Sequence, residues 1–322
     1  MADVAEPIGA PIVKASAWSE TIAFVIMVGF FIVAPAFIYP VFLMKVLCFA
    51  LFALAFNLLI GYVGLLSFGH ALFFGWAAYV SAYAAKAWHL TPELAILTGT
   101  AAAAVLGLVT GALAIRRQGI YFAMITLALA QMMYFFALQA KFTGGEDGIQ
   151  AVPRGRLFGV IDLADTKAMY AFVVAVFLAA FVLIYRIVNS PFGEVLKAIR
   201  ENEPRAISLG YKTERYKLVA FVMSATLAGL AGATKAIAIG LASLSDVQWQ
   251  MSGEVVLMTL VGGLGTIFGP VVGAAIIVAM QTQLVSFGQW VTIIQGVIFV
   301  VCVLLFRRGV VGELAAWLRI RL

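Results

Sequence analysis

Long apolar runs recur along the whole chain, separated by short polar segments. Each run is long enough for a helix of about 20 residues, the length needed to cross the ~30 Å hydrocarbon core of a bilayer. The runs cover residues 18–38, 41–60, 65–86, 93–115, 120–140, 168–188, 217–240 and 288–306. This pattern predicts an all-α polytopic membrane protein.

Two glycine-rich stretches interrupt the apolar pattern. The first reads GYVGLLSFGHA over residues 61–71, and the second reads VGGLGTIFGPVVGA within the apolar stretch 253–285. Two short helical pieces joined by the second break, together with 288–306, give three passes. The total is about ten membrane segments, or eight to ten if one piece is re-entrant. Such discontinuous helices are tolerated only where the freed backbone groups face protein or water.

The composition supports a membrane domain. Hydrophobic residues make up 64% of the 322 residues and charged residues only 11%, against about 45–50% and about 25% in soluble domains. The net charge of +6 does not indicate nucleic acid, because the basic residues lie between apolar runs, where they orient the chain. Cys48 and Cys302 lie inside apolar runs and are expected to be small buried hydrophobes, without a disulfide framework or a zinc site.

Basic residues near the ends of the runs predict the orientation. Arg116 and Arg117 occupy a short loop, residues 186–217 carry seven basic residues, and more follow position 306. By the positive-inside rule these segments are cytoplasmic. We therefore expect a cytoplasmic tail over 1–17, a membrane domain over 18–306 and a cytoplasmic tail over 307–322.

Candidate chemistry is sparse, which argues against an enzyme. The chain has no phosphate-cradling Gly-x-x-x-x-Gly-Lys-Ser/Thr motif, no metal-ligand pair and no nucleophile–base motif. Lys45 is expected to snorkel to the interface, Asp246 to lie outside the spans and Glu254 to begin one, so no intramembrane proton relay is expected. We predict no catalytic, cofactor-binding or metal-binding residue. Any energy for active transport must then come from a partner.

Polar residues beside the two breaks are candidates for a translocation path. Unwound segments line solute paths in transport proteins, because freed carbonyls and helix ends can face the solute. The alternatives are tight helix packing by small residues and, for the histidine, a neutral side chain whose hydrogen bonds fix packing; we favour the latter for His70. The path candidates are Asn57, Tyr62, Ser67 and His70 at the first break and Gly262, Gly263 and Gly265 at the second.

The segment 189–217 is a polar island in an apolar chain. Phe192, Leu196 and Ile199 repeat with the spacing of one helix face. Pro204 suits the first turn of a second short helix, and Gly210 suits its end. The pattern predicts an amphipathic helix, a corner and a short second helix. Two interpretations stay open from the residues: a helix in the lipid headgroups, or an element that docks into a partner's groove.

Three stretches, in order along the chain, resemble one transporter family. They are NLLIGYVGLLSFGHALFFGWAAYVSAY, AIRENEPRAISLGYKTERYKLVAFVMSATLAGLAGA and VGGLGTIFGPVVGA. They resemble the permeases of ABC importers for branched-chain (hydrophobic) amino acids. The Ser-Phe-Gly-His form at 67–70 resembles the M-type subunit of that family rather than its H-type sister.

The resemblance implies a division of labour in a bacterial inner membrane. An H-type permease would complete the path, two ABC ATPases would bind ATP and Mg²⁺, and a periplasmic binding protein would deliver the solute. This chain would bind no cofactor and no nucleic acid, with lipid around it. The solute would be a branched-chain amino acid, or in relatives urea, short amides, other amino acids or carboxylates. A self-contained facilitator or channel is the rival hypothesis.

The resemblance also assigns a coupling loop over residues 190–216, where the ATPases would dock. Its matching core is Ala198–Gly210. We expect Phe192 and Leu196 to add apolar contact to the docked interface, at about 25 cal/mol per Å² of buried area. The residues assigned to this loop are Phe192, Leu196, Ile199, Glu201, Asn202, Pro204, Arg205, Ala206 and Gly210.

Overall fold

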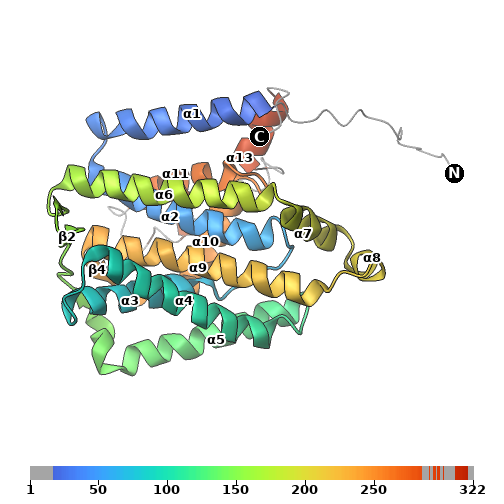
Figure 1. Ribbon diagram of the computed structural model, residues 1–322, viewed down its shortest axis with the longest axis horizontal. Helices are drawn as coiled ribbons and strands as arrows, with labels where there is room; N and C mark the ends of the chain where they lie inside the picture. Colours follow the sequence, from blue (N-terminus) through green and yellow to red (C-terminus); the bar gives the residue numbers. More distant parts are fainter. Residues whose placement is uncertain are drawn as a thin grey trace.

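The described part of the chain is a bundle of helices lying side by side (Figure 1). The computed structural model describes residues 17–284, 290, 293, 294, 296, 297, 300 and 309–317. The expected tail 1–17 and span 288–306 therefore lie almost entirely outside the described residues.

The helices follow the apolar runs closely. Their bounds are α1 Ala17–Val33, α2 Pro40–Ile60, α3 His70–Lys86, α4 Pro92–Ala114, α5 Ile120–Gln139, α6 Thr166–Val188, α7 Pro191–Glu201, α8 Glu203–Ser208, α9 Thr213–Ile239, α10 Trp249–Gly262, α11 Gly269–Leu284 and α13 Gly309–Trp317. Short 3₁₀ turns are η1 Ala34–Ala36, η2 Lys141–Thr143, η3 Gly145–Asp147 and η4 Leu244–Asp246. The all-α prediction is confirmed.

Strand structure in the described residues is confined to two short antiparallel pairs. β1 (Ile149–Gln150) pairs with β4 (Leu241–Ala242), and β2 (Arg156–Leu157) pairs with β3 (Ile161–Asp162). They connect helix ends on one side of the bundle.

Five of the described helices, α2, α4, α5, α6 and α9, are long and apolar enough to cross a membrane. α3 is shorter than expected, since it begins at His70 rather than at residue 65 and leaves residues 61–69 unwound. α10 and α11 have 14 and 16 residues. At 1.5 Å per residue they are about 21 and 24 Å long, less than the ~30 Å hydrocarbon core.

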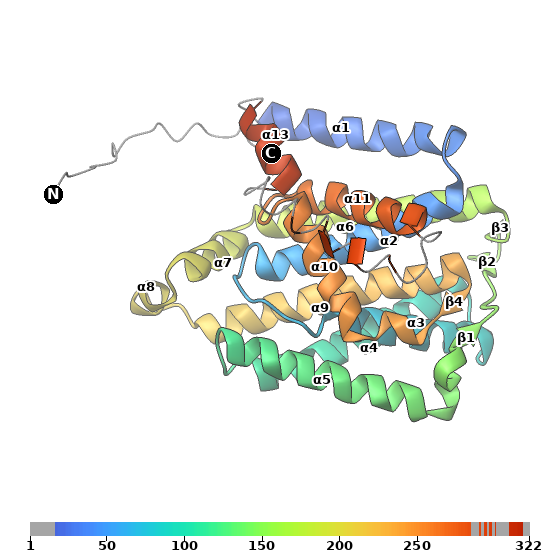
Figure 2. The same ribbon diagram turned by 180° about the vertical axis from the view of Figure 1, so that it is seen from behind.

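The bundle has two distinct ends (Figures 1 and 2). α7 and α8 project at one end, called here the α7 end, and the short strands lie at the opposite end, called the β end. The start of α1, the α4–α5 connection and α13 also lie at the α7 end. The segments expected to share one side of the membrane therefore share one end of the molecule, as far as they are described.

α2 forms the centre of the bundle and is enclosed by α6, α9, α10 and α11. Phe52 and Phe56 are fully buried, and the Phe52 ring stacks on Phe74 of α3 with 4.5 Å between centroids. α3, α4 and α9 pack through small residues, which let helices approach closely in a membrane. At Gly232 of α9 a Cβ would overlap the Phe74 carbonyl oxygen, so the α3–α9 contact requires glycine.

Replacing Gly232 with valine is expected to lower the thermal stability of the detergent-solubilised protein. Overpacking a close contact costs about 1–3 kcal/mol. Gly29→Ala in α1 is the matched control, because a Cβ there meets no atom within 4 Å. Melting curves followed by size-exclusion fluorescence would measure both variants, and equal melting temperatures would contradict the close α3–α9 packing.

Candidate functional site

The first break is a buried, unwound segment between α2 and α3. Most of residues 61–69 are buried, Gly64 being exposed. Because the backbone here makes no helical ladder, its polar groups need other partners. The Leu65 N–H donates to the Leu59 carbonyl, and the Gly69 N–H donates to the Ser67 hydroxyl at 3.2 Å. Ser67 thus satisfies the backbone of the break itself.

Hydroxyl groups from three other helices hold the junction of this break with α3. Thr126 of α5 accepts from the Phe68 N–H at 3.2 Å, and Ser252 of α10 accepts from the Ala71 N–H at 2.9 Å. Ser224 of α9 lies 2.8 Å from His70 Nε2. Each hydroxyl forms a hydrogen bond with a polar group that would otherwise be unpaired inside the domain.

His70 is a fully buried residue surrounded by aromatic rings. It packs edge-on against Phe56, Phe73 and Phe221, with ring centroids 5.1–6.0 Å apart. Ser224 donates to the Ala55 carbonyl, so its oxygen is left to accept from the Nε2–H of His70. These contacts fit the interpretation favoured from the sequence, a neutral histidine that fixes packing. Tyr62 and Ser67 are likewise buried.

The second break joins α10 and α11 into an antiparallel hairpin. A Cβ at Gly262 would overlap the Gly269 carbonyl, and one at Gly273 would overlap the Met258 carbonyl, which shows that the two helices are in backbone contact. Gly263 and Gly265 have φ angles of 124° and 74°, values that only glycine adopts readily. The glycines predicted as a flexible break therefore make a tight, specific turn.

Asn57 joins the two breaks. It lies near the end of α2, where its Nδ2 donates to the Thr266 carbonyl at 2.8 Å and its Oδ1 accepts from the Gly265 N–H at 3.0 Å. A Cβ at Gly61 would lie 2.9 Å from the Gly265 nitrogen, so the two breaks are in direct contact. One amide side chain thus replaces two backbone bonds that the turn cannot make for itself.

Arg200 of α7 reaches the same place. Its Nη1 donates a hydrogen bond to the Gly61 carbonyl, and a Cβ at Gly265 would lie 3.3 Å from that nitrogen. We call Asn57, Gly61, Arg200, Gly265 and Thr266 the break junction. The break junction connects the loop that the sequence predicts to be cytoplasmic, residues 190–216, to both breaks of the membrane domain.

The polar island has the predicted helix, corner and short helix. Ser190 caps α7 by accepting from the Gly193 N–H, and Asn202 caps α8 by accepting from the Arg205 N–H at 3.0 Å. Pro204 lies in the first turn of α8, and Gly210, with φ 90°, follows its end. Side-chain caps and proline placement thus define both helices locally.

The apolar face of α7 is covered by this chain itself. Leu196 and Ile199 are buried at 0% and 3% exposure, and Phe192 stacks on Tyr216 of α9 with 5.7 Å between centroids. The expectation that Leu196 meets a partner is therefore wrong, because its side chain has no exposed surface, whereas the half-buried Phe192 keeps part of its ring accessible and its partner contact stays a prediction. An amphipathic pattern shows which face is apolar but not what covers it. Ala206 is buried as well.

The tip of the loop is what remains exposed. Glu201, Asn202, Pro204, Arg205 and Gly210 are all exposed. Two apolar residues of this tip that were not predicted as site residues, Ile207 and Leu209, are 55% and 70% exposed. The sequence offers one sign of this exposure: Ile207 and Leu209 follow the corner at Asn202 and so lie outside the apolar repeat that forms the buried face of α7.

The base of α8 is anchored to the bundle by charge. Glu203 forms an ion pair with Lys217 of α9 at 2.5 Å and accepts from Gln118 of the α4–α5 connection at 3.1 Å. A hollow of about 210 Å³ lies between this anchor, Arg200 and the first break. The base of α8 is thus bonded to α9, and Arg200 of the preceding helix is bonded to the break junction.

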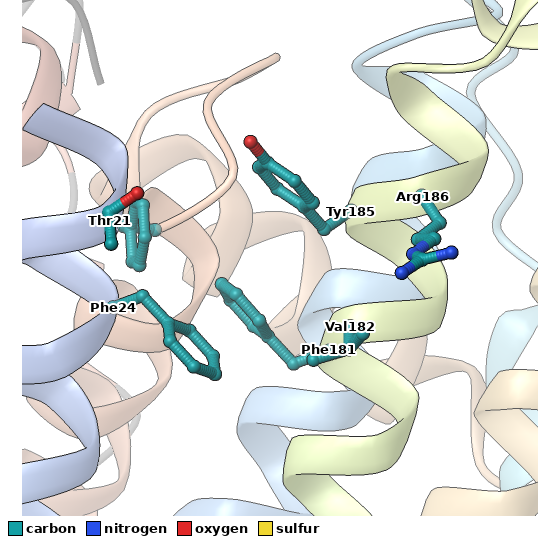
Figure 3. Close-up of a pocket in the computed structure, with 7 residues that line it drawn as sticks. Thr21, Phe24, Phe181, Val182, Tyr185 and Arg186 are labelled. Carbon is teal, nitrogen blue, oxygen red and sulfur yellow. The ribbon is translucent and has the colours of Figure 1, made fainter. Parts of the chain in front are cut away.

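A separate hollow of about 250 Å³ lies between α1 and α6 (Figure 3). Phe24 and Phe181 stack across it at 5.7 Å, and Phe268 of the second break contacts Phe181 at 5.3 Å. Arg186 lies along α6, away from Thr21 and Phe24 (Figure 3). The aromatic and apolar part of its wall is Phe24, Phe181, Val182 and Phe268, and the polar part is Thr21, Tyr185 and Arg186.

A buried ion pair went unrecognised in the sequence. Lys235 of α9 lies 2.6 Å from Asp246, with side-chain exposures of 7% and 3%. Asp246 was expected to lie outside the spans; it follows α9 but folds back into the domain. Lys235 gave no signal because it is a single charge in a long apolar run, and its partner follows the end of that helix.

The chain is similar in sequence to known transport permeases. A sequence profile of the family described as "Branched-chain amino acid transport system / permease component" matches residues 39–306. The chain is 27% identical over 277 residues to the high-affinity branched-chain amino acid transport system permease protein LivM of Escherichia coli K12, covering 77% of this chain and 64% of LivM. The LivM of Salmonella typhimurium LT2 is 28% identical over 276 residues, with the same coverage.

A ribose import permease protein, RbsC of Bacillus subtilis 168, is 27% identical over 197 residues, covering 56% of this chain and 58% of RbsC. The chain spans less than two thirds of the length of these relatives. No solved structure matches. In the described residues, no group of three or more His, Cys, Asp or Glu side chains is placed to hold a metal ion.

Replacing Asn57 with leucine is expected to loosen the second break. The Gly265 N–H and the Thr266 carbonyl would lose their partners, and an unsatisfied buried group costs about 1–3 kcal/mol. Hydrogen exchange of peptides covering 263–268 would speed up by about tenfold or more. Thr282→Val is the control, because in the described residues its hydroxyl donates to the Val278 carbonyl of its own helix, α11. Unchanged exchange at 263–268 would contradict the bridging role of Asn57.

Proposed function

Because the chain belongs to the family of branched-chain amino acid transport system permease components, we propose that it is a transmembrane subunit of an ATP-driven importer. It forms, with a homologous H-type permease, the path for branched-chain amino acids or a related small solute. Two ABC ATPases bind ATP and Mg²⁺ at one side, and a periplasmic binding protein delivers the solute at the other. The chain itself is a transport subunit without an active site.

The observation that carries this proposal is the break junction. Arg200 ties a projecting, exposed helix pair to both discontinuous segments of the membrane domain. A lipid-resting helix would lay its apolar face in the bilayer, whereas here that face packs on the chain's own α9 and leaves a mixed polar and apolar tip exposed. This arrangement favours a docking element over a lipid contact.

In this proposal the exposed tip of the loop transmits the movement of the ATPases to the membrane domain. Nucleotide-driven closure of the ATPases displaces α8, and the Glu203–Lys217 pair and Arg200 pass the displacement to α9 and the breaks. Moving a two-state equilibrium from 1:99 to 99:1 takes about 5.5 kcal/mol of differential binding. The ion pair and the hydrogen bonds restrict independent movement of α7 and α8, so that more of this energy reaches α9 and the breaks.

The α7 end is proposed to face the cytoplasm of a bacterial inner membrane. It carries Arg116 and Arg117 and the basic residues of 186–217, as the positive-inside rule requires. The start of α1 and α13 lie at the same end, which supports both termini on the cytoplasmic side (Figure 1). The β end then receives the binding protein.

A self-contained facilitator or channel is the second candidate, and co-purification separates the two. Affinity-tagged chain, produced in its native host and solubilised in mild detergent, is expected to retain a second permease and ATPases in stoichiometric amounts. Uptake by the purified chain alone in proteoliposomes, without ATP or a partner, would contradict the importer and support the facilitator.

Placing aspartate at both Ile207 and Leu209 is expected to remove most of the co-purifying ATPase. These exposed apolar side chains would lose their burial, worth about 25 cal/mol per Å², and each would present a charge to the interface. The control is Phe158→Asp, an equally conspicuous exposed residue (75%) at the β end. Retention of ATPase at the control's level by the Ile207/Leu209 variant would exclude the tip as the dock.

Replacing Glu201 and Arg205 together with alanine is expected to lower transport-coupled ATP hydrolysis by about thirtyfold or more, because truncating a hydrogen-bonded charge that is buried in an interface costs about 2–5 kcal/mol. Membrane insertion should be unchanged, since both side chains are exposed. Alanine at the exposed Glu194–Lys197 pair of α7 is the control. Full coupled activity in the Glu201/Arg205 variant would contradict the docking assignment.

A further inference from the structure

The hollow between α1 and α6 takes no part in the break junction. Its volume is about 250 Å³, and its apolar wall comes from three segments: Phe24 of α1, Phe181 and Val182 of α6, and Phe268 just before α11. Val182 is 41% exposed, so the hollow opens on the outer surface of the bundle. Because the chain belongs to a family of membrane permeases and α6 is long enough to cross the bilayer, this opening lies within the thickness of the bilayer.

The hollow lies in the part of the α1–α6 contact that is nearer the α7 end. Nearer the β end, the Tyr170 hydroxyl donates to the Phe31 carbonyl at 2.6 Å, and the Phe31 ring meets Phe177 edge-on, with 5.6 Å between centroids. Nearer the α7 end, Phe24 and Phe181 stack across the hollow itself (Figure 3). Side chains that border a gap lose dispersion contacts, so a molecule that fills the hollow would stabilise the position of α1.

Arg186 places a positive charge at the mouth of the hollow. It lines the hollow from the last turn of α6 and is exposed, and no ion pair among the described residues includes it. Arg186 lies 20 residues beyond Thr166, or about 30 Å along the helix at 1.5 Å per residue, which is the thickness of the hydrocarbon core. The exposed charges of Asp165 and Lys167 belong at the membrane surface where α6 begins. The Arg186 guanidinium therefore lies at the headgroup level of the opposite leaflet.

The hollow and its mouth together suit an amphiphilic molecule. The Arg186 side chain lies away from Thr21 and Phe24 (Figure 3), so its charge is at the edge of the hollow and not among the aromatic rings. A guanidinium binds phosphate oxygens through paired N–H donors, and basic pockets between transmembrane helices bind the headgroups of anionic lipids. A small soluble anion would leave the aromatic wall unused, and an uncharged apolar molecule would leave Arg186 unused.

We propose that this hollow binds an anionic phospholipid of the leaflet at the α7 end, with one acyl chain between α1 and α6 and the phosphate at Arg186. The acyl chain fills the space between Phe24 and Phe268, and so links α1 to the second break. The site goes beyond the proposed function, because it requires only that the chain lies in a bilayer and involves neither the solute nor the ATPases.

The experiment reconstitutes the full chain into nanodiscs that contain equal amounts of phosphatidylglycerol, which is anionic, and phosphatidylethanolamine, which is zwitterionic. Native mass spectrometry then counts the lipids that stay bound to the released protein. We expect the wild type to retain phosphatidylglycerol over phosphatidylethanolamine by about fivefold, the preference that one arginine near the membrane surface provides. Arg186→Met should retain the two lipids about equally. Arg156→Met is the control and should keep the preference, since Arg156 is an exposed arginine of β2 at the β end.

A second pair of variants tests the hollow separately from the charge. Val182→Trp places an indole ring in the hollow and is expected to lose most of the retained lipid. Leu183→Trp is its matched control, because Leu183 is 51% exposed on the same turn of α6 but is not among the described residues that line the hollow. Size-exclusion chromatography checks that each variant is folded, and this pair and the wild-type lipid ratio still test the site if Arg186→Met is not.

Three outcomes would overturn the lipid site. The first is equal retention of the two lipids by the wild type, or an unchanged preference in Arg186→Met. The second is equal lipid retention by Val182→Trp and Leu183→Trp, which would place the bound lipid elsewhere on the surface. The third is a wild type that retains neither lipid, which would indicate that a partner subunit or another part of this chain fills the hollow.

Discussion

The two hydrogen bonds made by the Asn57 side chain are the constraint on which the α7 end depends. A membrane domain can contain an unwound backbone only if its freed N–H and C=O groups find partners inside the protein. Asn57 supplies one donor and one acceptor to the turn between α10 and α11, and Arg200 supplies a donor to the end of α2. Without these side chains, the backbone groups where the two breaks meet would lose these partners, and α7 would lose its hydrogen bond to the end of α2.

The two ends of the bundle around this contact carry different kinds of interaction. At the α7 end, bonds between breaks and a projecting helix pair suit the transmission of movement from a partner. Toward the β end, the buried Lys235–Asp246 ion pair holds η4 against α9. α2 links the two regions, since it carries Asn57 and packs along α9, which carries Lys235.

The sequence predicts most of the fold because its signals are local. Apolar runs and prolines located the long helices, and Pro204 and Gly210 located α8. The contacts of the site are not local: Asn57 bonds to residues more than 200 positions away, and no periodicity reports such a pairing. For the same reason the sequence predicts neither the burial of Lys235 nor which part of the protein covers the apolar face of α7. Burial by a helix that is distant in the chain leaves no pattern in the neighbouring sequence.

The central claim is that α7 and both breaks move as one connected unit. Hydrogen exchange of the assembled importer, with and without a non-hydrolysable ATP analogue, tests it most directly. We expect the nucleotide to change exchange together in peptides covering 61–69, 198–210 and 263–268, and in Arg200→Met to change it only in 198–210. Nucleotide effects that leave 61–69 and 263–268 untouched in the wild type, or that persist there in Arg200→Met, would contradict the account.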